Sequence, residues 1–170
     1  MYLILVASVN ENMRLARRLE AQLEALGASC ECVDLVRIGV PMYDSIKEER
    51  DGIPKAVREL MGLMERAEGY VVVAPEYNGS IPPVLTSAIA WISRSGEDFR
   101  ALFSGRFVQL ASHSGSGGHD LMNAMRAQFT KLGAVVAPRQ ILITPLSPLK
   151  EESSEKILAQ FIAWCGCPGA

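Results

Sequence analysis

The chain has 170 residues, of which 49% are hydrophobic and 21% charged, and its formal net charge is −2. This composition suits a globular domain and is too apolar for a disordered chain, and the length predicts a single domain over residues 1–170. The near-neutral charge, with no basic block, argues against a nucleic-acid partner. No apolar run approaches the roughly 18 residues of a membrane-spanning helix, so we expect no membrane partner.

The first residues and the cysteines bear on the compartment and on metal binding. Residues 1–6 lack a charged leader region and lead directly into periodic sequence, so we expect a first strand rather than a signal peptide, and hence a cytoplasmic protein. The four cysteines form two C-x-C pairs, Cys30/Cys32 and Cys165/Cys167. This spacing differs from that of zinc sites and of redox C-x-x-C motifs. We therefore expect reduced thiols that pack as small hydrophobic groups, and no metal.

Strand-like and helical segments alternate along the chain. Short apolar or β-rich runs lie at 2–7, 29–35, 70–74, 106–111 and 135–143, the last interrupted at Pro138. Helical periodicity follows each run: from residues 8–12 to Gly27, over 54–67, over 82–94, from about 121 to Gly133, and over 150–165. The charged segment 37–52 is expected to be a solvated loop, and 165–170 a frayed tail. This alternation predicts an α/β fold, a doubly wound parallel sheet with helices on both faces.

Three polar loops are expected to form the functional site. In a five-stranded sheet of order 2-1-3-4-5, the crevice lies between strands 1 and 3, at the carboxyl ends of the strands. The loops after strands 1, 3 and 4 then converge, and these are the loops rich in Ser, Asn and Gly. Their convergence is the main argument for a ligand site.

The first loop precedes a helix, where free N–H groups and the helix dipole favour an anion such as a phosphate. Ser8, Asn10 and Asn12 could add side-chain donors. The alternative is ordinary N-capping by Asn10 or Asn12.

The loop after the third strand combines a flat aromatic side chain, Tyr77, with an amide, Asn78, and a glycine, Gly79, that lets a ligand approach the backbone. Such a surface suits a planar heterocycle with polar edges. The alternative is an ordinary Asn-Gly turn.

The loop after the fourth strand, Ser114–Gly118, resembles a phosphate-binding glycine loop. It departs from G-x-G-x-x-G because Asp120 takes the last glycine position, and it follows the fourth strand, which argues against a dinucleotide-binding Rossmann unit. His113 and His119 could be catalytic or solvated bystanders. The sequence has no G-x-S-x-G elbow, P-loop or His/carboxylate cluster, so we assign no catalytic side chain and no metal ligand.

Two adjacent segments resemble the signature of a known family. Residues 75–82 (PEYNGSIP) and 85–94 (LTSAIAWISR) are similar to the signature of NADPH-dependent FMN reductases. These are flavodoxin-like reductases of flavins, quinones, chromate and azo compounds. Weaker similarities lie at 40–44, 114–118 and 132–134, so the resemblance covers nearly the whole chain.

The resemblance implies non-covalently bound FMN, with NADPH or NADH as cosubstrate and a small acceptor. The FMN phosphate would lie at the first loop, and the ring between the other two. It also implies a homodimer or homotetramer with the flavin near the interface, for which the apolar helix at 82–94 is a suitable surface. The chemistry then belongs to the cofactor, and no acid or base side chain is required. The implied FMN-binding residues are Ser8, Asn10, Asn12, Pro75, Glu76, Tyr77, Asn78, Gly79, Ser114, Gly115 and Gly118.

The first loop departs from the family pattern. The family reads Gly-Ser-x-Arg, a few residues, then Ser-x-Asn, whereas residues 7–12 (ASVNEN) are shorter and lack the Arg and the second Ser. We expect modest FMN affinity, with the phosphate relying on helix N–H groups and nearby Arg14. Two alternatives stay open: an electron carrier of flavodoxin type, which the small net charge disfavours, and a fold relative that has lost FMN and acts as a binding protein.

Overall fold

The structure, a computed structural model, describes residues 1–96, 98 and 100–166. The expected tail is described as far as residue 166, and the rest of it lies outside the described residues. The elements follow one another in this order: β1 (Tyr2–Val6), α1 (Glu11–Ala25), β2 (Cys30–Asp34), α2 (Ser45–Asp51), α3 (Lys55–Arg66), β3 (Gly69–Val73), α4 (Pro83–Ser93), β4 (Phe107–His113), α5 (His119–Lys131), β5 (Val135–Val136), β6 (Ile141–Ile143) and α6 (Glu151–Cys165).

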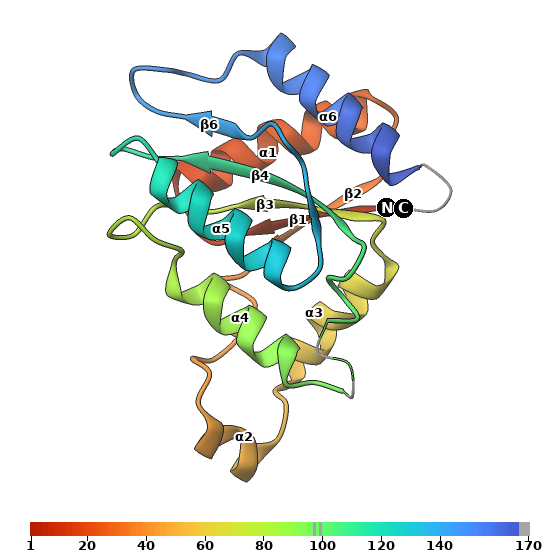
Figure 1. Ribbon diagram of the computed structural model, residues 1–170, viewed down its shortest axis with the longest axis vertical. Coiled ribbons are helices and arrows are strands. Elements are labelled where there is room, and N and C mark those ends of the chain that lie inside the picture. The colour runs from red at the N-terminus through yellow and green to blue at the C-terminus, as the bar shows by residue number, and fades with distance from the viewer. Residues whose placement is uncertain (97, 99, 167–170) are drawn as a thin grey trace.

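The strands form one parallel sheet in the order β2-β1-β3-β4-β5, with β6 also paired to β4. This confirms the predicted doubly wound α/β fold, since 2-1-3-4-5 is the flavodoxin strand order. Helices α1 and α6 cover one face, and α3, α4 and α5 cover the other (Figure 1). Among the described residues, no helix is both long and apolar enough to cross a membrane.

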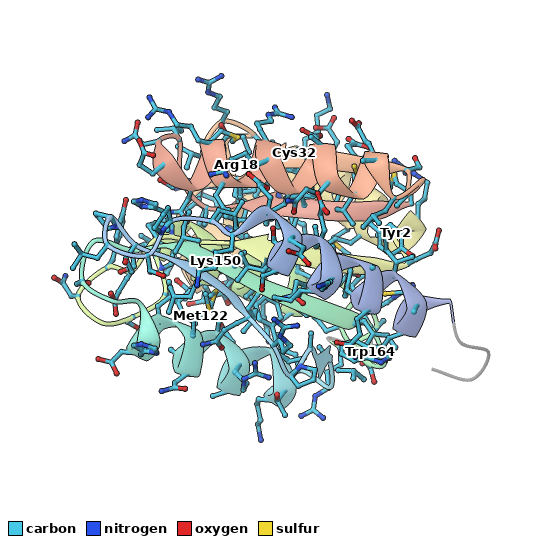
Figure 2. All side chains as sticks on the ribbon, turned by 90° about the horizontal axis from the view of Figure 1, so that it is seen from above. Tyr2, Arg18, Cys32, Met122, Lys150 and Trp164 are labelled. Carbon is cyan, nitrogen blue, oxygen red and sulfur yellow. The ribbon has the colours of Figure 1, made fainter. Side chains whose placement is uncertain are left out.

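Side-chain alternation along β1 divides the core into two layers. Leu3 and Leu5 belong to the cluster on the α3, α4 and α5 face, whereas Ile4 and Val6 belong to the cluster beneath α1 and α6. All five residues of this strand are buried, as expected for a central parallel strand covered on both sides. The edge strand β2 is less buried, and its Cys32 lies beside α1, while Met122 of α5 lies toward the opposite edge (Figure 2).

Glycines end two helices where the sequence predicted it. Gly27 has φ +81°, and Ala28 N donates to Leu23 O (2.9 Å), which is the pattern of a Schellman C-cap. Gly133 has φ +89° and ends α5 in the same way. The left-handed conformation at these positions favours glycine because it has no Cβ.

The prediction that 37–52 forms a loop is partly wrong, because α2 occupies Ser45–Asp51. Asp44 caps this helix by accepting a hydrogen bond from Lys47 N (2.7 Å). No α2 residue is buried, so the helix lacks the apolar periodicity that would reveal it in the sequence.

The predicted fifth strand is split in two. Pro138 has no N–H to donate, and the chain leaves the sheet between β5 and β6. Gln109 of β4 bridges this gap, because its Nε2 donates to Arg139 O (2.8 Å). Both halves still pair with β4, so the sheet order is preserved.

Helix α4 is central in this chain. Its apolar side chains pack into the core that α3, α4 and α5 share, so most of the apolar surface of this helix is covered by the chain itself. The segment before α2 is fastened to it: Pro41 O accepts from Ser87 Oγ (3.0 Å) and Trp91 Nε1 (2.9 Å). Tyr43 N donates to Ser87 Oγ (2.7 Å), and the Tyr43 and Trp91 rings meet edge to face at 5.1 Å.

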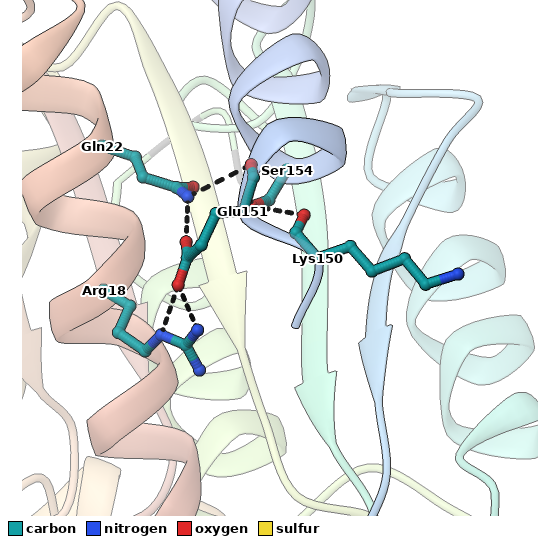
Figure 3. A network of polar contacts seen from close by, with 5 residues as sticks. All are labelled: Arg18, Gln22, Lys150, Glu151 and Ser154. Atoms are coloured by element: carbon teal, nitrogen blue, oxygen red, sulfur yellow. Dashed lines mark hydrogen bonds and ion pairs between the residues drawn. The ribbon is translucent and has the colours of Figure 1, made fainter. Parts of the chain in front are cut away.

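A polar cluster joins the two helices of the other face. Glu151, at the start of α6, accepts hydrogen bonds from Arg18 and Gln22 of α1 (Figure 3). Ser154 Oγ donates a hydrogen bond to Glu151 O (2.9 Å). The charged pair is half exposed, so it fixes the relative position of the helices more than it stabilises the fold.

Candidate functional site

The loops after β1, β3 and β4 leave the same edge of the sheet, because all three strands are parallel and adjacent. Figure 1 shows the loops after β3 and β4 projecting from that edge. The predicted convergence of these loops is therefore present in the fold. The sequence alone does not show which side chains of these loops face a ligand.

The first loop offers a helix N-terminus open to a ligand. The first backbone bond of α1 runs from Arg14 N to Asn10 O (3.0 Å), so the N–H groups of residues 11–13 have no acceptor within the helix. Asn10 is exposed, and its side chain makes no capping bond, while Ser8 is half-buried beside it. The two charged side chains here, Glu11 and Arg14, form an ion pair, with 2.5 Å between Arg14 Nη1 and Glu11 Oε1.

Asn12 has a different role from its neighbours. Its Nδ2 donates to His113 O (2.9 Å), and its Oδ1 accepts from His113 N (2.8 Å). Asn12 is only 3% exposed. The amide thus acts as a backbone-like partner at the end of β4 and fastens the first loop to the loop after β4.

The loop after β3 is a tight reverse turn. Tyr77 and Ser80 exchange two backbone hydrogen bonds of 3.0 Å, and the two residues between them, Asn78 and Gly79, have φ of +52° and +71°. Positive φ at both central positions is the type I′ hairpin geometry that Asn-Gly favours. The Asn-Gly turn weighed from the sequence is therefore present. It holds Tyr77 52% exposed at the edge of the sheet, where its ring is accessible.

Glu76 connects this turn to the glycine-rich loop. Its Oε2 accepts from Ser114 Oγ (2.8 Å), from Ser116 Oγ, and from Gly118 N (3.1 Å). These hydrogen bonds lower the pKa of the Glu76 carboxyl, first the hydroxyl of Ser116 and then that of Ser114, so the group is ionised at neutral pH. Ser116 was absent from the site residues predicted from the sequence.

Gly118 is required by close packing. Its φ is +75°, and a Cβ there would lie 2.5 Å from Leu142 Cδ1 and 3.0 Å from Ser114 Cβ. Gly115, by contrast, has nothing within 4 Å of such an atom and faces open space. Of the two glycines of this loop that were predicted to line a ligand, Gly115 is exposed and Gly118 is buried.

A cleft of about 310 Å³ lies between the first loop and the start of α4. Tyr77 stands at its rim, and Ser8 and Asn10 contribute its polar groups. Val36, which follows β2, also lines the cleft but was not among the residues predicted from the sequence; the strand order could have identified it, because β2 neighbours β1. The cleft is lined by Ala7, Ser8, Val9, Asn10, Val36, Tyr77, Pro82, Pro83 and Val84.

Apart from Pro75, the residues predicted from the sequence fall into two groups. The first group, Asn12, Glu76, Ser114 and Gly118, is engaged in contacts that hold the loops together. The second group is at least partly accessible and consists of Ser8, Asn10, Tyr77, Asn78, Gly79 and Gly115. Pro75 is buried at the end of β3.

The thiols and histidines lie outside this arrangement or enter it through the backbone. Burial raises the pKa of the Cys30 and Cys32 thiols to about 11, so both are protonated and unreactive at neutral pH. Both pack against the apolar cluster beneath α1 and α6, as predicted for small hydrophobic groups. His113 is held through its main chain by Asn12, and His119 begins α5 and is exposed. No group of three or more potential metal ligands occurs in the described part of the chain.

The family model for NADPH-dependent FMN reductases matches residues 2–146. The chain belongs to the NADPH-dependent FMN reductase family. This membership confirms the resemblance seen in the PEYNGS segment, and the match includes all three loops of the site.

Individual relatives match shorter stretches. The chain is 42% identical over 55 residues to a quinone reductase of Escherichia coli (strain K12), covering 32% of this chain and 29% of that protein. It is 28% identical over 118 residues to an NADPH azoreductase of Bacillus sp. (strain OY1-2), covering 68% of this chain and 62% of that protein. These alignments therefore span less than two thirds of the length of either relative.

The fold is similar to that of FerB, described as a flavoenzyme NAD(P)H:(acceptor) oxidoreductase, from Paracoccus denitrificans. The TM-score is 0.79 at 17% identity, and the alignment covers 96% of each chain. At this identity the comparison establishes the architecture alone. It agrees with the strand order found here.

Proposed function

We propose that this FMN reductase family member is an NAD(P)H-dependent oxidoreductase. It binds FMN non-covalently and passes reducing equivalents from NADPH or NADH to a small acceptor. The acceptor classes are flavins, quinones, azo compounds and metal oxyanions. Quinone reductase and azoreductase relatives support the quinone and azo classes in particular.

One observation carries this proposal: the open N-terminus of α1 and the exposed Tyr77 ring border the same cleft. FMN has a phosphate at one end and a planar ring at the other. The free N–H groups of α1, with Ser8 and Asn10, suit the phosphate. The backbone at residues 78–79, the Tyr77 ring and the open Gly115 suit the ring system.

When bound, FMN would supply the hydride and electron chemistry that connects the nicotinamide nucleotide with the acceptor. The protein positions the two ends of the cofactor and supplies apolar walls at Val9, Val36 and Val84. We assign no general acid or base, because the proposed chemistry requires none from the protein.

A second candidate is a binding protein of the same fold that no longer holds FMN. Asn12 favours it, because both ends of its amide are hydrogen-bonded to the main chain of His113. Arg14 is likewise paired with Glu11. The first loop then offers a ligand only Ser8, Asn10 and backbone N–H groups.

Titration of the purified protein with FMN, followed by flavin fluorescence and absorbance, tests the proposal. We expect saturable quenching, then bleaching of the bound flavin by NADPH under anaerobic conditions and recovery of colour with a quinone. Flavin that binds but is not bleached by NADH or NADPH would indicate an electron carrier. A colourless protein without quenching would indicate the second candidate.

The matched variants are Asn10→Ala, which removes an exposed donor of the first loop, and Ser29→Ala, which removes an exposed hydroxyl remote from the cleft. We expect weaker FMN binding in the first and unchanged binding in the second. Equal affinity in both variants would contradict phosphate binding at the first loop.

We further propose a homodimer or homotetramer in the cytoplasm. Met42 is 67% exposed and Ile46 is 75% exposed, and both flank Tyr43, which packs on α4. Large apolar side chains this exposed suit an interface between copies. The described cysteines, Cys30, Cys32 and Cys165, are free thiols, which suits a reducing compartment.

A further inference from the structure

The glycine-rich loop after β4 has the make-up of an anion-binding loop. Ser114 and Ser116 supply hydroxyls, Gly117 and Gly118 have φ of +110° and +75°, and α5 begins at the next residue. Loops of this kind direct N–H and O–H donors at a phosphate in many nucleotide-binding proteins. The donors of this loop already converge on an anion, and that anion is the carboxylate of Glu76.

The donors are held in place by the core beneath them. Ser114 N donates to Ile143 O (3.0 Å), which fastens the loop to β6. Ser116 N donates to Ser114 Oγ (3.2 Å), and this orients the Ser114 hydroxyl so that it donates to Glu76. Gly118 fits only without a Cβ because of Leu142. The loop is therefore preorganised around the carboxylate.

The carboxylate also determines what the loop cannot bind. A phosphate at the same donors would be placed directly against an ionised carboxylate, and it would lose the donors that the carboxylate already uses. The open N-terminus of α1 has no comparable occupant, since Glu11 pairs with Arg14. The protein thus has two similar anion sites: the 114–118 loop, which is occupied by the Glu76 carboxylate, and the N-terminus of α1, which is open.

We propose that Glu76 is a positioning residue: its carboxylate is the resident anion of the 114–118 loop, locking the Tyr77 turn to the start of α5 and reserving the N-terminus of α1 for the ligand's phosphate. The consequence for FMN rests on the proposed function. The filling of the loop by Glu76 does not.

The test is chemical rescue of Glu76→Ala by sodium formate, without FMN. Formate is a carboxylate small enough to enter the space left by the side chain. We expect a saturable rise of about 2–4 °C in the unfolding midpoint of the variant, with no such rise from sodium chloride at equal ionic strength. The matched control is Glu65→Ala, which removes an exposed carboxylate on α3 and is expected to show no formate response.

A Glu76→Ala variant that responds identically to formate and to chloride would overturn the proposal. If this variant does not fold, Glu76→Gln provides a second test that needs no formate, because its amide keeps the size of the side chain but loses the charge. We then expect the Gly118 amide proton resonance to move upfield by NMR, as its hydrogen bond weakens. An unchanged Gly118 resonance would also overturn the proposal.

FMN binding provides a separate readout. We expect Glu76→Gln to raise the FMN dissociation constant about tenfold, as loss of a supporting contact commonly does. Because the formate experiment needs no flavin, a formate response without FMN binding would uphold the role of Glu76 and reject the proposed function. FMN binding without any formate response would do the reverse.

Discussion

At the scale of single residues, the candidate site depends on polar side chains whose hydrogen bonds hold its loops together. Asn12 and Glu76 are the main examples, and each joins loops that are far apart in the sequence. Both were predicted from the sequence to touch FMN. Their hydrogen bonds in the structure are directed at the loop after β4, so their predicted contact with FMN stays a prediction.

Replacement of Asn12 should destabilise the protein. Asn12→Leu leaves the partly buried N–H and C=O of His113 without their side-chain partners, and we expect a loss of about 2–3 kcal/mol in the free energy of unfolding. Urea denaturation measures this, with Asn123→Ala on the exposed face of α5 as the control. Equal stability of the two variants would contradict the role assigned to the amide.

Gly118→Ala is expected to be more harmful than Gly115→Ala. The first variant combines an unfavourable left-handed conformation with contact on Leu142 and Ser114, for about 2–4 kcal/mol in all. The second adds a methyl group to open space. A thermal unfolding comparison decides this, and a smaller loss for Gly118→Ala than for Gly115→Ala would contradict the packing described here.

The charge of Glu76 predicts a pH dependence. Its pKa in the folded protein is lowered, so its contribution to stability is present above the unfolded value of about 4.3 and is lost as the pH falls through the folded value. The stability difference between the wild type and Glu76→Gln should therefore be constant near neutrality and shrink below about pH 4. Urea unfolding midpoints of both proteins, measured from neutral pH to below about pH 4, test this. A stability difference that grows on acidification would contradict the prediction.

At the scale of elements, the strands and long helices were predictable because burial imposes a period on the sequence. The all-buried β1 and the helix ends at Gly27 and Gly133 are examples. Helix α2 was not predictable in this way, since none of its residues is buried and the capping residue Asp44 is the only local signal of its start. The division of the last predicted strand was only partly predictable. Pro138 indicated an interruption, but Gln109, which bridges it, lies 30 residues before its acceptor, Arg139.

The attachment of segment 40–44 to α4 is an element-scale contact that can be tested. Ser87 accepts from Tyr43 N and donates to Pro41 O, so Ser87→Ala removes both hydrogen bonds. We expect a loss of about 1–2 kcal/mol in stability and faster hydrogen exchange confined to residues 40–52. Ser93→Ala, near the end of the same helix, is the control. Uniform exchange rates in both variants would show that Ser87 does not hold the segment.

At the scale of the whole molecule, the strand order brings the three loops to one edge and leaves apolar side chains exposed near α4. Because the apolar face of α4 is covered by its own core, Met42 and Ile46 are the better candidates for contact between copies.

Ile46→Glu is expected to shift the protein toward monomers. The exposed position of Ile46 means that the fold tolerates the change, while a charge at an apolar interface opposes association. Sedimentation velocity measures the mass, and Leu26→Glu, an exposed apolar position at the end of α1, is the control. Dimers or tetramers of unchanged stability in Ile46→Glu would exclude this surface.

The sequence by itself determined the family, the alternation of strands and helices, and the three loops that form the site, because these follow from local periodicity and from short motifs such as PEYNGS. The tertiary structure alone decided which polar residues of those loops face one another and which face the cleft. The hydrogen bonds of Asn12 to His113 span 101 residues, and that of Glu76 to Ser114 spans 38. Pairings at such distances leave no periodic trace in the sequence, since they are created only when parallel strands bring their carboxyl ends together.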